Sequence, residues 1–208
     1  MSIIGGNHAL TIIQDNIKKC ELCELCKTMP FSPVSGMGNK NAKILLVGEA
    51  PGEDESIAEE PFVGQCGRFL DKMLVESGIQ RDDIYIANTV NCRPTHDNLG
   101  KKNRPPTKQE INICKSWLFQ QINAIKPKVI FTLGKIPTSI VLSLKSTITL
   151  TDYIGKTFSY QDSAVIPLYH PSFLLQYGKK YTELTIKYLK EGFTLSKEPN
   201  HNKTIQGG

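Results

Sequence analysis

The chain has no long hydrophobic run and only one tryptophan. Its clearest uninterrupted aliphatic stretch covers residues 44–47, far short of the roughly 20 residues that a membrane-spanning helix needs. The N-terminus also lacks the basic segment and long apolar segment that mark a secretory signal. The sequence therefore predicts an intracellular, cytoplasmic protein with no membrane partner.

Low-complexity tracts, internal repeats and the apolar-poor composition of disordered chains are also missing. Hydrophobic residues make up 39% of the sequence and charged residues 22%, as in ordinary globular proteins. A chain of 208 residues can form a full core without disulfides. We expect one domain over residues 1–195, a polar C-terminal tail over 196–208, and a monomer.

Charge and cysteine content leave the function open. Lys and Arg outnumber Asp and Glu by 25 to 20, and this net charge of +5 permits a nucleic-acid partner without requiring one. The six cysteines are not expected to form disulfides in a reducing cytosol, so their spacing matters more than their number. Cys66 fits a small packing residue at the start of a helix.

The apolar residues alternate between short strands and longer helices. Nearly continuous apolar runs predict buried strands at 43–47, 83–87, 128–133 and 164–169, and Pro167 weakens the last or places it near a sheet edge. Helices are predicted at 7–18, 64–77, 107–124, 178–194 and from residue 134 onward. Thr107 and Glu110 form a capping box for the third of these. This order predicts an α/β fold with a parallel sheet covered on both faces.

Polar residues follow three of the predicted strands. Ligands of open parallel sheets bind beyond the carboxyl ends of the strands. At these ends the chain has the turn 48–52 with Glu49, then Asn88, and then His170 before a proline. Taken singly, they fit a tight turn, a strand cap and a structural histidine. Their convergence on one sheet edge instead predicts a single site.

Two residues suit a pyrimidine base. The Asn88 amide can accept a hydrogen bond from N3–H of uracil and donate one to O4, whereas cytosine presents the reverse pattern. Phe62 is either a core residue or an aromatic platform for a planar base, where stacking contributes ~1–3 kcal/mol. Both residues are consistent with a nucleobase as ligand.

Five cysteines have the spacing of metal ligands. Cys20, Cys23 and Cys26 form a CxxCxxC pattern, and Cys92 and Cys114 follow farther along the chain. Two of the first three could join the distant pair in a four-cysteine site for zinc or an iron–sulfur cluster. Spacing alone does not choose the two, and free buried cysteines are the alternative.

The segment 93–113 lies between the two distant cysteines and is rich in basic residues. These are Arg93, Lys101, Lys102, Arg104 and Lys108. The segment is either a solvated loop or a loop that contacts phosphates and is organised by the metal centre.

Five segments match a known family in order and spacing. They are GEAPG (48–52), PFVGQCGRFL (61–70), YIANTVNCRP (85–94), NRPPTKQE (103–110) and YHPSFLL (169–175). Through them the chain resembles the family 4 uracil-DNA glycosylases, the iron–sulfur members of their superfamily, from about residue 20 to residue 175. The resemblance implies a three-layer α/β/α sandwich around a four-stranded parallel sheet. It also implies an enzyme that flips uracil out of DNA and hydrolyses its N-glycosidic bond, leaving an abasic site for base excision repair.

The resemblance further assigns roles to residues at matching positions. The residues that it implies for catalysis are Glu49, Asn88 and His170. The residues that it implies for contact with uracil or DNA are Gly48, Ala50, Pro51, Gly52, Phe62, Asn88, Asn103 and Ser172. The ligands that it implies for a [4Fe–4S] cluster are Cys20, Cys23, Cys92 and Cys114, with Cys26 outside the set. It also places Leu174 and Leu175 in the loop that the superfamily inserts into the duplex.

One departure from the family pattern keeps an alternative open. Residues 95–102 form a longer stretch than usual and include His96. Relatives that become covalently trapped on uracil-DNA carry a reactive histidine in this region, but also a basic run that is absent here. The alternative is therefore a uracil-DNA-binding protein that traps DNA or binds it without turnover. Because no lysine nucleophile is expected at the site, we predict a monofunctional glycosylase.

Overall fold

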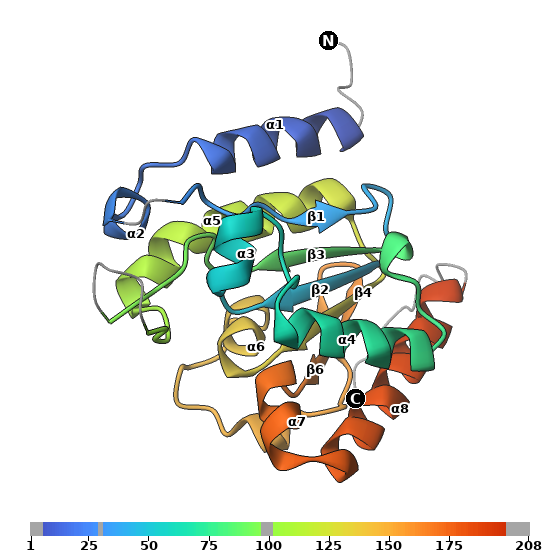
Figure 1. Ribbon diagram of the computed structural model, residues 1–208. Coiled ribbons are helices and arrows are strands. Elements are labelled where there is room, and N and C mark those ends of the chain that lie inside the picture. Colours follow the sequence, from blue (N-terminus) through green and yellow to red (C-terminus); the bar gives the residue numbers. More distant parts are fainter. Residues whose placement is uncertain (1–5, 29–30, 97–101, 199–208) are drawn as a thin grey trace.

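The computed structural model describes residues 6–28, 31–96 and 102–198, and Figure 1 shows the fold. Within these residues six strands form one sheet: β1 (Met37–Gly38), β2 (Ile44–Gly48), β3 (Ile84–Asn88), β4 (Val129–Leu133), β5 (Phe158–Tyr160) and β6 (Ser163–Leu168). Their order across the sheet is β1-β3-β2-β4-β6-β5. The four central strands are parallel, and β1 and β5 are antiparallel edges.

The four predicted parallel strands are thus confirmed, and the sheet is wider than expected by its two edges. Both edge strands escaped prediction because they are too short and too exposed to show an apolar run: β1 has two residues and β5 three. Pro167 was expected to weaken its strand or to place it near a sheet edge, and the strand register is consistent with this. Strand β5 pairs with β6 only as far as Val165, so Pro167 lies beyond the end of that pairing.

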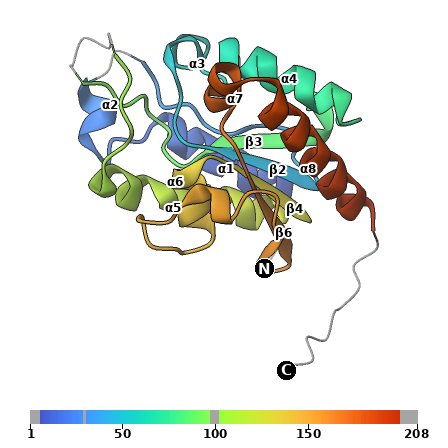
Figure 2. The same cartoon turned by 90° about the horizontal axis from the view of Figure 1, so that it is seen from below.

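Helices cover both faces of the sheet, which gives the three-layer sandwich (Figure 2). The helices are α1 (Gly6–Lys18), α2 (Glu24–Thr28), α3 (Glu53–Ala58), α4 (Gln65–Glu76), α5 (Lys108–Ile125), α6 (Lys135–Val141), α7 (Pro171–Tyr177) and α8 (Lys179–Lys197). Side chains of β2 alternate between the two faces: Ile44 and Leu46 pack with α4, α7 and α8, whereas Leu45 and Val47 pack with α1, α5 and α6.

Each predicted helix is present. The predicted capping box opens α5: the Thr107 hydroxyl accepts a hydrogen bond from the Glu110 N–H, and the Glu110 carboxylate accepts one from the Thr107 N–H. Helix α8 continues past its predicted end to Lys197 and buries Ser196, whereas the rest of the predicted tail, 199–208, lies outside the described residues. Among the described helices, none has the length and apolar content needed to cross a membrane.

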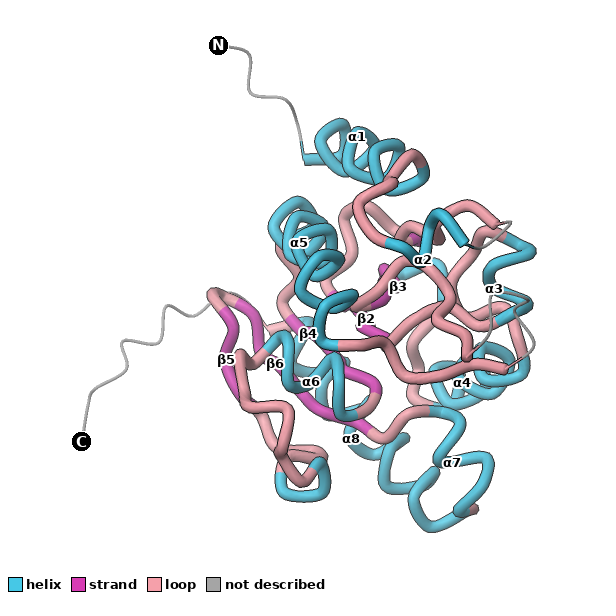
Figure 3. Tube along the Cα trace, turned by 90° about the vertical axis from the view of Figure 1, so that its left-hand side faces the viewer, coloured by secondary structure: helices cyan, strands magenta, loops and turns pink. Residues whose placement is uncertain are grey.

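The carboxyl ends of the parallel strands all open on one edge of the sandwich. Figure 3 looks onto this edge, where loops and the short helices α2, α3, α6 and α7 gather around the strand ends. Within the sheet, Gly48 at the end of β2 pairs in register with Asn88 at the end of β3. The fold therefore brings together residues that are distant in sequence.

Candidate active site

A cavity of about 570 Å³ lies at this edge of the sheet. The predicted residues that line it are Glu49, Ala50, Pro51, Gly52, Phe62, Asn88, Asn103, His170 and Ser172. Gly48 lies directly behind them. A Cβ atom at position 48 would come within 2.3 Å of Asn88 Oδ1 and 2.7 Å of the Phe62 ring. Glycine here lets the amide and the aromatic ring approach each other.

The Asn88 side chain carries an unused acceptor. Only 3% of the residue is exposed, and its Oδ1 atom has no hydrogen-bond partner among the described residues. A buried polar atom without a partner costs about 1–3 kcal/mol, so a ligand that donates to it recovers that free energy. The Phe62 ring beside it restricts such a ligand to a flat shape.

Phe62 adopts an unusual backbone conformation. Its φ of 57° lies in the left-handed region, which costs a bulky residue free energy. Helix α4 makes room for this turn through Gly67, where a Cβ atom would lie 1.7 Å from the Phe62 carbonyl oxygen. The residue is 6% exposed, and the centroid of its ring lies 6.2 Å from that of the His170 ring. Phe62 thus belongs both to the core and to the cavity wall.

Glu55 is a site residue that the sequence analysis missed. Its carboxylate accepts hydrogen bonds from the N–H of Gly52, at 3.1 Å, and from the N–H of Gly64, at 3.0 Å. One side chain therefore ties the turn 48–52 to the segment that carries Phe62. Its place three residues after Gly52, the N-cap of α3, was the available signal.

Glu49 projects a carboxyl group into the cavity from the turn after β2. The residue is half-buried, and desolvation raises the pKa of its carboxyl. A carboxylate with a raised pKa is a better proton acceptor than one in water. The position and chemistry of Glu49 suit a group that orients a water molecule or faces a developing cation.

His170 is the N-cap residue of α7. Its Nδ1 atom accepts a hydrogen bond from the Ser172 N–H at 3.2 Å and lies 2.8 Å from the Ser172 hydroxyl oxygen. Burial lowers the pKa of His170 to about 4, so the imidazole is neutral at pH 7. Because Nδ1 accepts from a backbone N–H, the single proton of the neutral ring lies on Nε2, which can donate.

Asn103 lies at the exposed rim of the cavity. Its Oδ1 atom accepts a hydrogen bond from Arg93 Nε at 2.6 Å, and Arg93 Nη2 lies 3.4 Å from Glu53 Oε2. The side chain of Arg93 is only 4% exposed, whereas that of Glu53 is 62% exposed. With its oxygen engaged, the Asn103 amide retains its NH2 group as a donor.

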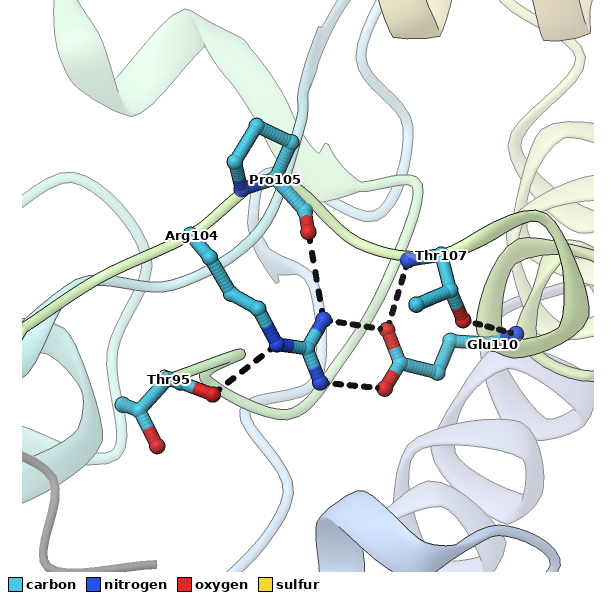
Figure 4. Close-up of polar contacts among 5 residues, drawn as sticks. All are labelled: Thr95, Arg104, Pro105, Thr107 and Glu110. Atoms are coloured by element: carbon cyan, nitrogen blue, oxygen red, sulfur yellow. Dashed lines mark hydrogen bonds and ion pairs between the residues drawn. The ribbon is translucent and has the colours of Figure 1, made fainter. Parts of the chain in front are cut away.

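Arg104 is held by a second internal network, which Figure 4 shows. Its guanidinium group donates to both oxygens of Glu110, at 2.8 and 2.6 Å, and to the carbonyl oxygens of Thr95, at 2.9 Å, and Pro105, at 3.1 Å. Phosphate contact, one of the two alternatives for this loop, would therefore fall to its lysines, because Arg93 and Arg104 bind within the protein. Lys102 and Lys108 remain exposed, and Lys101 lies outside the described residues.

No lysine nucleophile was expected at the site, but a lysine does line the cavity. Lys135 lines the cavity together with Gly134, because β4 also ends at this edge and α6 begins there. Cys66, predicted only to pack, also lines the cavity, and burial raises the pKa of its thiol. The position of β4 in the predicted sheet was the signal that could have found Lys135.

The predicted insertion loop is also different in the structure. Leu174 and Leu175 lie in helix α7, and Leu174 is 1% exposed within the core. Leu175 is 41% exposed. The alternation of buried and exposed positions along a helix explains the difference, because one face of α7 packs on α4.

Residues 95–102 are closed at their base by an isolated bridge between Thr95 and Asn103. His96 is exposed, and it is absent from the described residues that line the cavity. Residues 97–101 of this stretch lie outside the described residues.

The cysteines gather in a separate apolar cluster. Cys92 and Cys114 are buried with Leu25, Val90 and Ile111, and burial raises the pKa of both thiols. Residues packed against this cluster include Cys23, Cys26, Ala50 and Trp117. Cys20 is half-buried and acts electrostatically on Cys92 and Cys114. Among the described residues, no three His, Cys, Asp or Glu side chains are grouped closely enough to hold a metal ion.

The sheet order and the position of the cavity define an α/β protein with its ligand site at the ends of parallel strands. A model of the uracil DNA glycosylase superfamily matches residues 35–191. The chain is 39% identical to the type-4 uracil-DNA glycosylase of Thermotoga maritima over 168 residues, which cover 80% of this chain and 83% of that protein. It therefore belongs to the uracil-DNA glycosylase superfamily and, within it, to the type-4 family.

Two further relatives are also type-4 uracil-DNA glycosylases. The type-4 uracil-DNA glycosylase of Archaeoglobus fulgidus is 37% identical over 164 residues, covering 76% of this chain and 77% of that protein. The protein of Saccharolobus solfataricus is 36% identical over 206 residues, covering 94% and 88%. The similarity thus extends over most of both chains.

Proposed function

We propose that the protein is a uracil-DNA glycosylase that accepts an extruded uracil in the cavity and hydrolyses its N-glycosidic bond. The partner is uracil-containing DNA, and the product is an abasic site, the entry point of base excision repair. The observation that carries this proposal is the buried, unpartnered Oδ1 atom of Asn88 beside the Phe62 ring. The names of the type-4 relatives support it.

Recognition in this proposal rests on the Asn88 amide. Its Oδ1 atom accepts from N3–H of uracil, and its NH2 group donates to O4. Cytosine would place an unprotonated ring nitrogen against Oδ1 and an amino group against the NH2 group. An acceptor would then face an acceptor, and a donor would face a donor. Because the site is buried, these unpaired groups exclude cytosine.

The leaving group is stabilised by His170. When the bond between N1 and C1′ breaks, its electron pair passes to uracil, and negative charge develops on O2. The neutral imidazole donates its Nε2 proton in a hydrogen bond to O2 and needs no change of charge to do so. One such donor typically contributes roughly 2.7–4 kcal/mol to catalysis.

Glu49 acts on the other side of the breaking bond. The sugar becomes cationic as uracil departs, and the nearby carboxylate lowers the free energy of that cation. Water then adds its oxygen to C1′, and its proton passes to the carboxylate of Glu49. Because water is the nucleophile, Lys135 at the rim takes no covalent part, and the enzyme is monofunctional.

A [4Fe–4S] cluster would be held by Cys20, Cys23, Cys92 and Cys114. The fit rests on Cys23, Cys92 and Cys114, which share one apolar cluster, with half-buried Cys20 outside it. It also rests on Trp117, whose buried Nε1 atom has no partner among the described residues. Cys26 also packs against this cluster, but its thiol donates to the Cys23 carbonyl oxygen at 2.7 Å. A ligand must instead be a thiolate. The cluster would supply four iron–thiolate bonds that cross-link these segments.

The test is an incubation of the protein with excess labelled oligonucleotide that contains one uracil. We expect many turnovers to abasic sites, which alkali converts to strand breaks. Asn88→Ala should remove most of this activity, and an oligonucleotide with cytosine in place of uracil should stay intact. A stoichiometric protein–DNA adduct that resists denaturation, or uracil binding with no release, would overturn the proposal in favour of the trapping or binding alternative.

A further inference from the structure

We infer that the exposed end of α7 is a stacking platform for a base of single-stranded DNA, next to the base in the cavity. Tyr177 provides the platform, and Lys179 and Lys180 contact the phosphates of the same strand. The inference deepens the proposed function and rests on it for the identity of the strand. It assigns a binding site outside the uracil cavity and a preference for unpaired DNA.

The first observation is a ladder of aromatic rings that runs from the cavity to the surface. Tyr169 and Phe173 line the cavity, and their rings stack with centroids 4.8 Å apart and planes 13° apart. The ring of Tyr177 stacks on the far side of this pair, 4.4 Å from Phe173 and tilted by 29°. Tyr177 is 57% exposed. The ladder therefore ends in a ring that can receive one further flat group.

The second observation is that a further ring, Tyr181, packs against two rings of the ladder. Tyr181 of α8 meets the edge of Tyr169 at 5.2 Å and 75° and the edge of Phe173 at 5.3 Å and 74°. Edge-to-face contacts of this kind are favourable and hold the rings in place. A ligand on Tyr177 would lose little free energy in ordering the platform.

The charge next to Tyr177 fits a nucleic-acid strand. Lys179 and Lys180 are exposed in the first turn of α8, which contains no acidic residue. Lysines in a first turn are unfavourable for the helix dipole, and a phosphate on them reverses that effect. Lys179 lies 3.6 Å from the exposed carboxylate of Glu183, a weak surface pair that a phosphate can replace.

Single-stranded DNA fits this surface better than a duplex does. In a duplex each base face is covered by its neighbour, whereas an unpaired strand offers free faces for aromatic stacking. Of the two residues that the family pattern places in the duplex-inserting loop, Leu174 is buried and Leu175 is 41% exposed. Tyr177, the last residue of α7, is more exposed than Leu175 and carries a flat ring.

The test measures binding without any uracil, so it does not depend on catalysis. The probe is a short fluorescein-labelled oligodeoxythymidylate, followed by fluorescence anisotropy. Tyr177→Ala should weaken binding by roughly 5- to 100-fold, and Tyr177→Phe by less than about twofold. The control is Tyr160→Ala, because Tyr160 also stacks on a phenylalanine, Phe119, but lies in the edge strand β5. Equal binding by Tyr177→Ala and the wild type would overturn the inference.

A tryptophan variant supplies a second measurement that does not depend on a loss of binding. In Tyr177→Trp the platform is retained, and stacking of thymine should quench the new indole fluorescence. Quenching by oligodeoxythymidylate, but much less by a matched duplex at the same concentration, is the expected result. Fluorescence unchanged at saturating single strand would contradict stacking at this position.

The lysines are tested through the salt dependence of binding. The double variant Lys179→Ala, Lys180→Ala should reduce the slope of log K against log salt by about 1.4, the value for two phosphates of a single strand. Lys187→Ala is the matched control, because Lys187 lies in the same helix and pairs with Glu191 at 3.8 Å. An unchanged slope in the double variant would remove the lysines from the site.

The two proposals can fail separately. If the wild type removes uracil but Tyr177→Ala binds single strands normally, the platform is wrong and the glycosylase proposal stands. If no uracil is removed but binding depends on Tyr177, the catalytic proposal is wrong and the protein is a single-strand binder.

Discussion

The cavity and the cysteine cluster lie on two sides of the same turn, yet they are built differently. In the cavity, protein groups hold the site residues: Glu55 ties two loops together, Ser172 fixes His170, and Arg93 fixes Asn103. In the cysteine cluster, Trp117 Nε1 has no partner in the described chain. In the cavity, protein contacts hold the side chains and one acceptor, Asn88 Oδ1, has no partner among the described residues. In the cysteine region, the side chains themselves have the composition of a site that a bound group completes.

Ala50 connects the two regions. It lines the cavity and packs against the cluster of Cys92 and Cys114. If the comparison is right, damage to the cysteine region should cost folding, and damage to the cavity should cost chemistry at constant stability. The following changes test this division.

The largest effect is expected from Cys114→Ser. Loss of one ligand should release the cluster and lower the melting temperature by more than about 10 °C, since 1 kcal/mol corresponds to about 2–4 °C in a domain of this size. Iron content and thermal unfolding are the measurements. Cys26→Ser, the control, should retain both its iron and its melting temperature. A folded, iron-loaded but inactive Cys114→Ser protein would reverse the division.

His170→Ala should lower the turnover rate by roughly 100- to 1,000-fold, because it removes the donor to the departing uracil. The melting temperature should fall by only a few degrees, because His170 also caps α7, and binding of uracil-DNA should remain nearly intact. Single-turnover kinetics and a binding titration separate the two effects. Equal losses of rate and binding would show that His170 holds the substrate and does not act on the leaving group.

The rate should depend on pH through Glu49. The carboxylate is the active form, and burial raises the pKa of this group, so activity should fall as the pH drops through a value above the ordinary range of glutamate. His170 titrates only near pH 4 and stays neutral above it. Glu49→Gln should be slow, with this acid limb absent. An unchanged acid limb in that variant would assign the titration to another group.

The smallest effect concerns the Arg104–Glu110 pair. The hydrogen bonds from Arg104 lower the pKa of Glu110, so its folded-state pKa lies below the unfolded value. The stability that it contributes, about 1 kcal/mol, is present above the unfolded value and is lost as the pH falls through the folded one. Glu110→Gln should therefore destabilise the protein at pH 7 but much less near pH 3. Glu183→Gln is the exposed control and should change stability little at either pH.

Most of the fold and the cavity could be predicted because they leave local signals. Buried strands are continuous apolar runs, and Glu49, Asn88 and His170 directly follow such runs. The edge strands left no run, and the contacts of Glu55 depend on how two loops meet in space. Leu174 is a case in which a local signal misled. The family motif suggested that it inserts into the duplex, but its burial depends on the packing of α7 against α4.

Gly48 has a consequence for how base preference could diversify. Any side chain there would collide with both Asn88 and Phe62, so this wall of the cavity cannot change one residue at a time. Thr149, Leu150 and Thr151 also line the cavity, and the structure shows no collision with Asn88 for them. If Asn88 excludes cytosine as proposed, substitutions at these three positions could broaden the range of accepted bases without changing that exclusion.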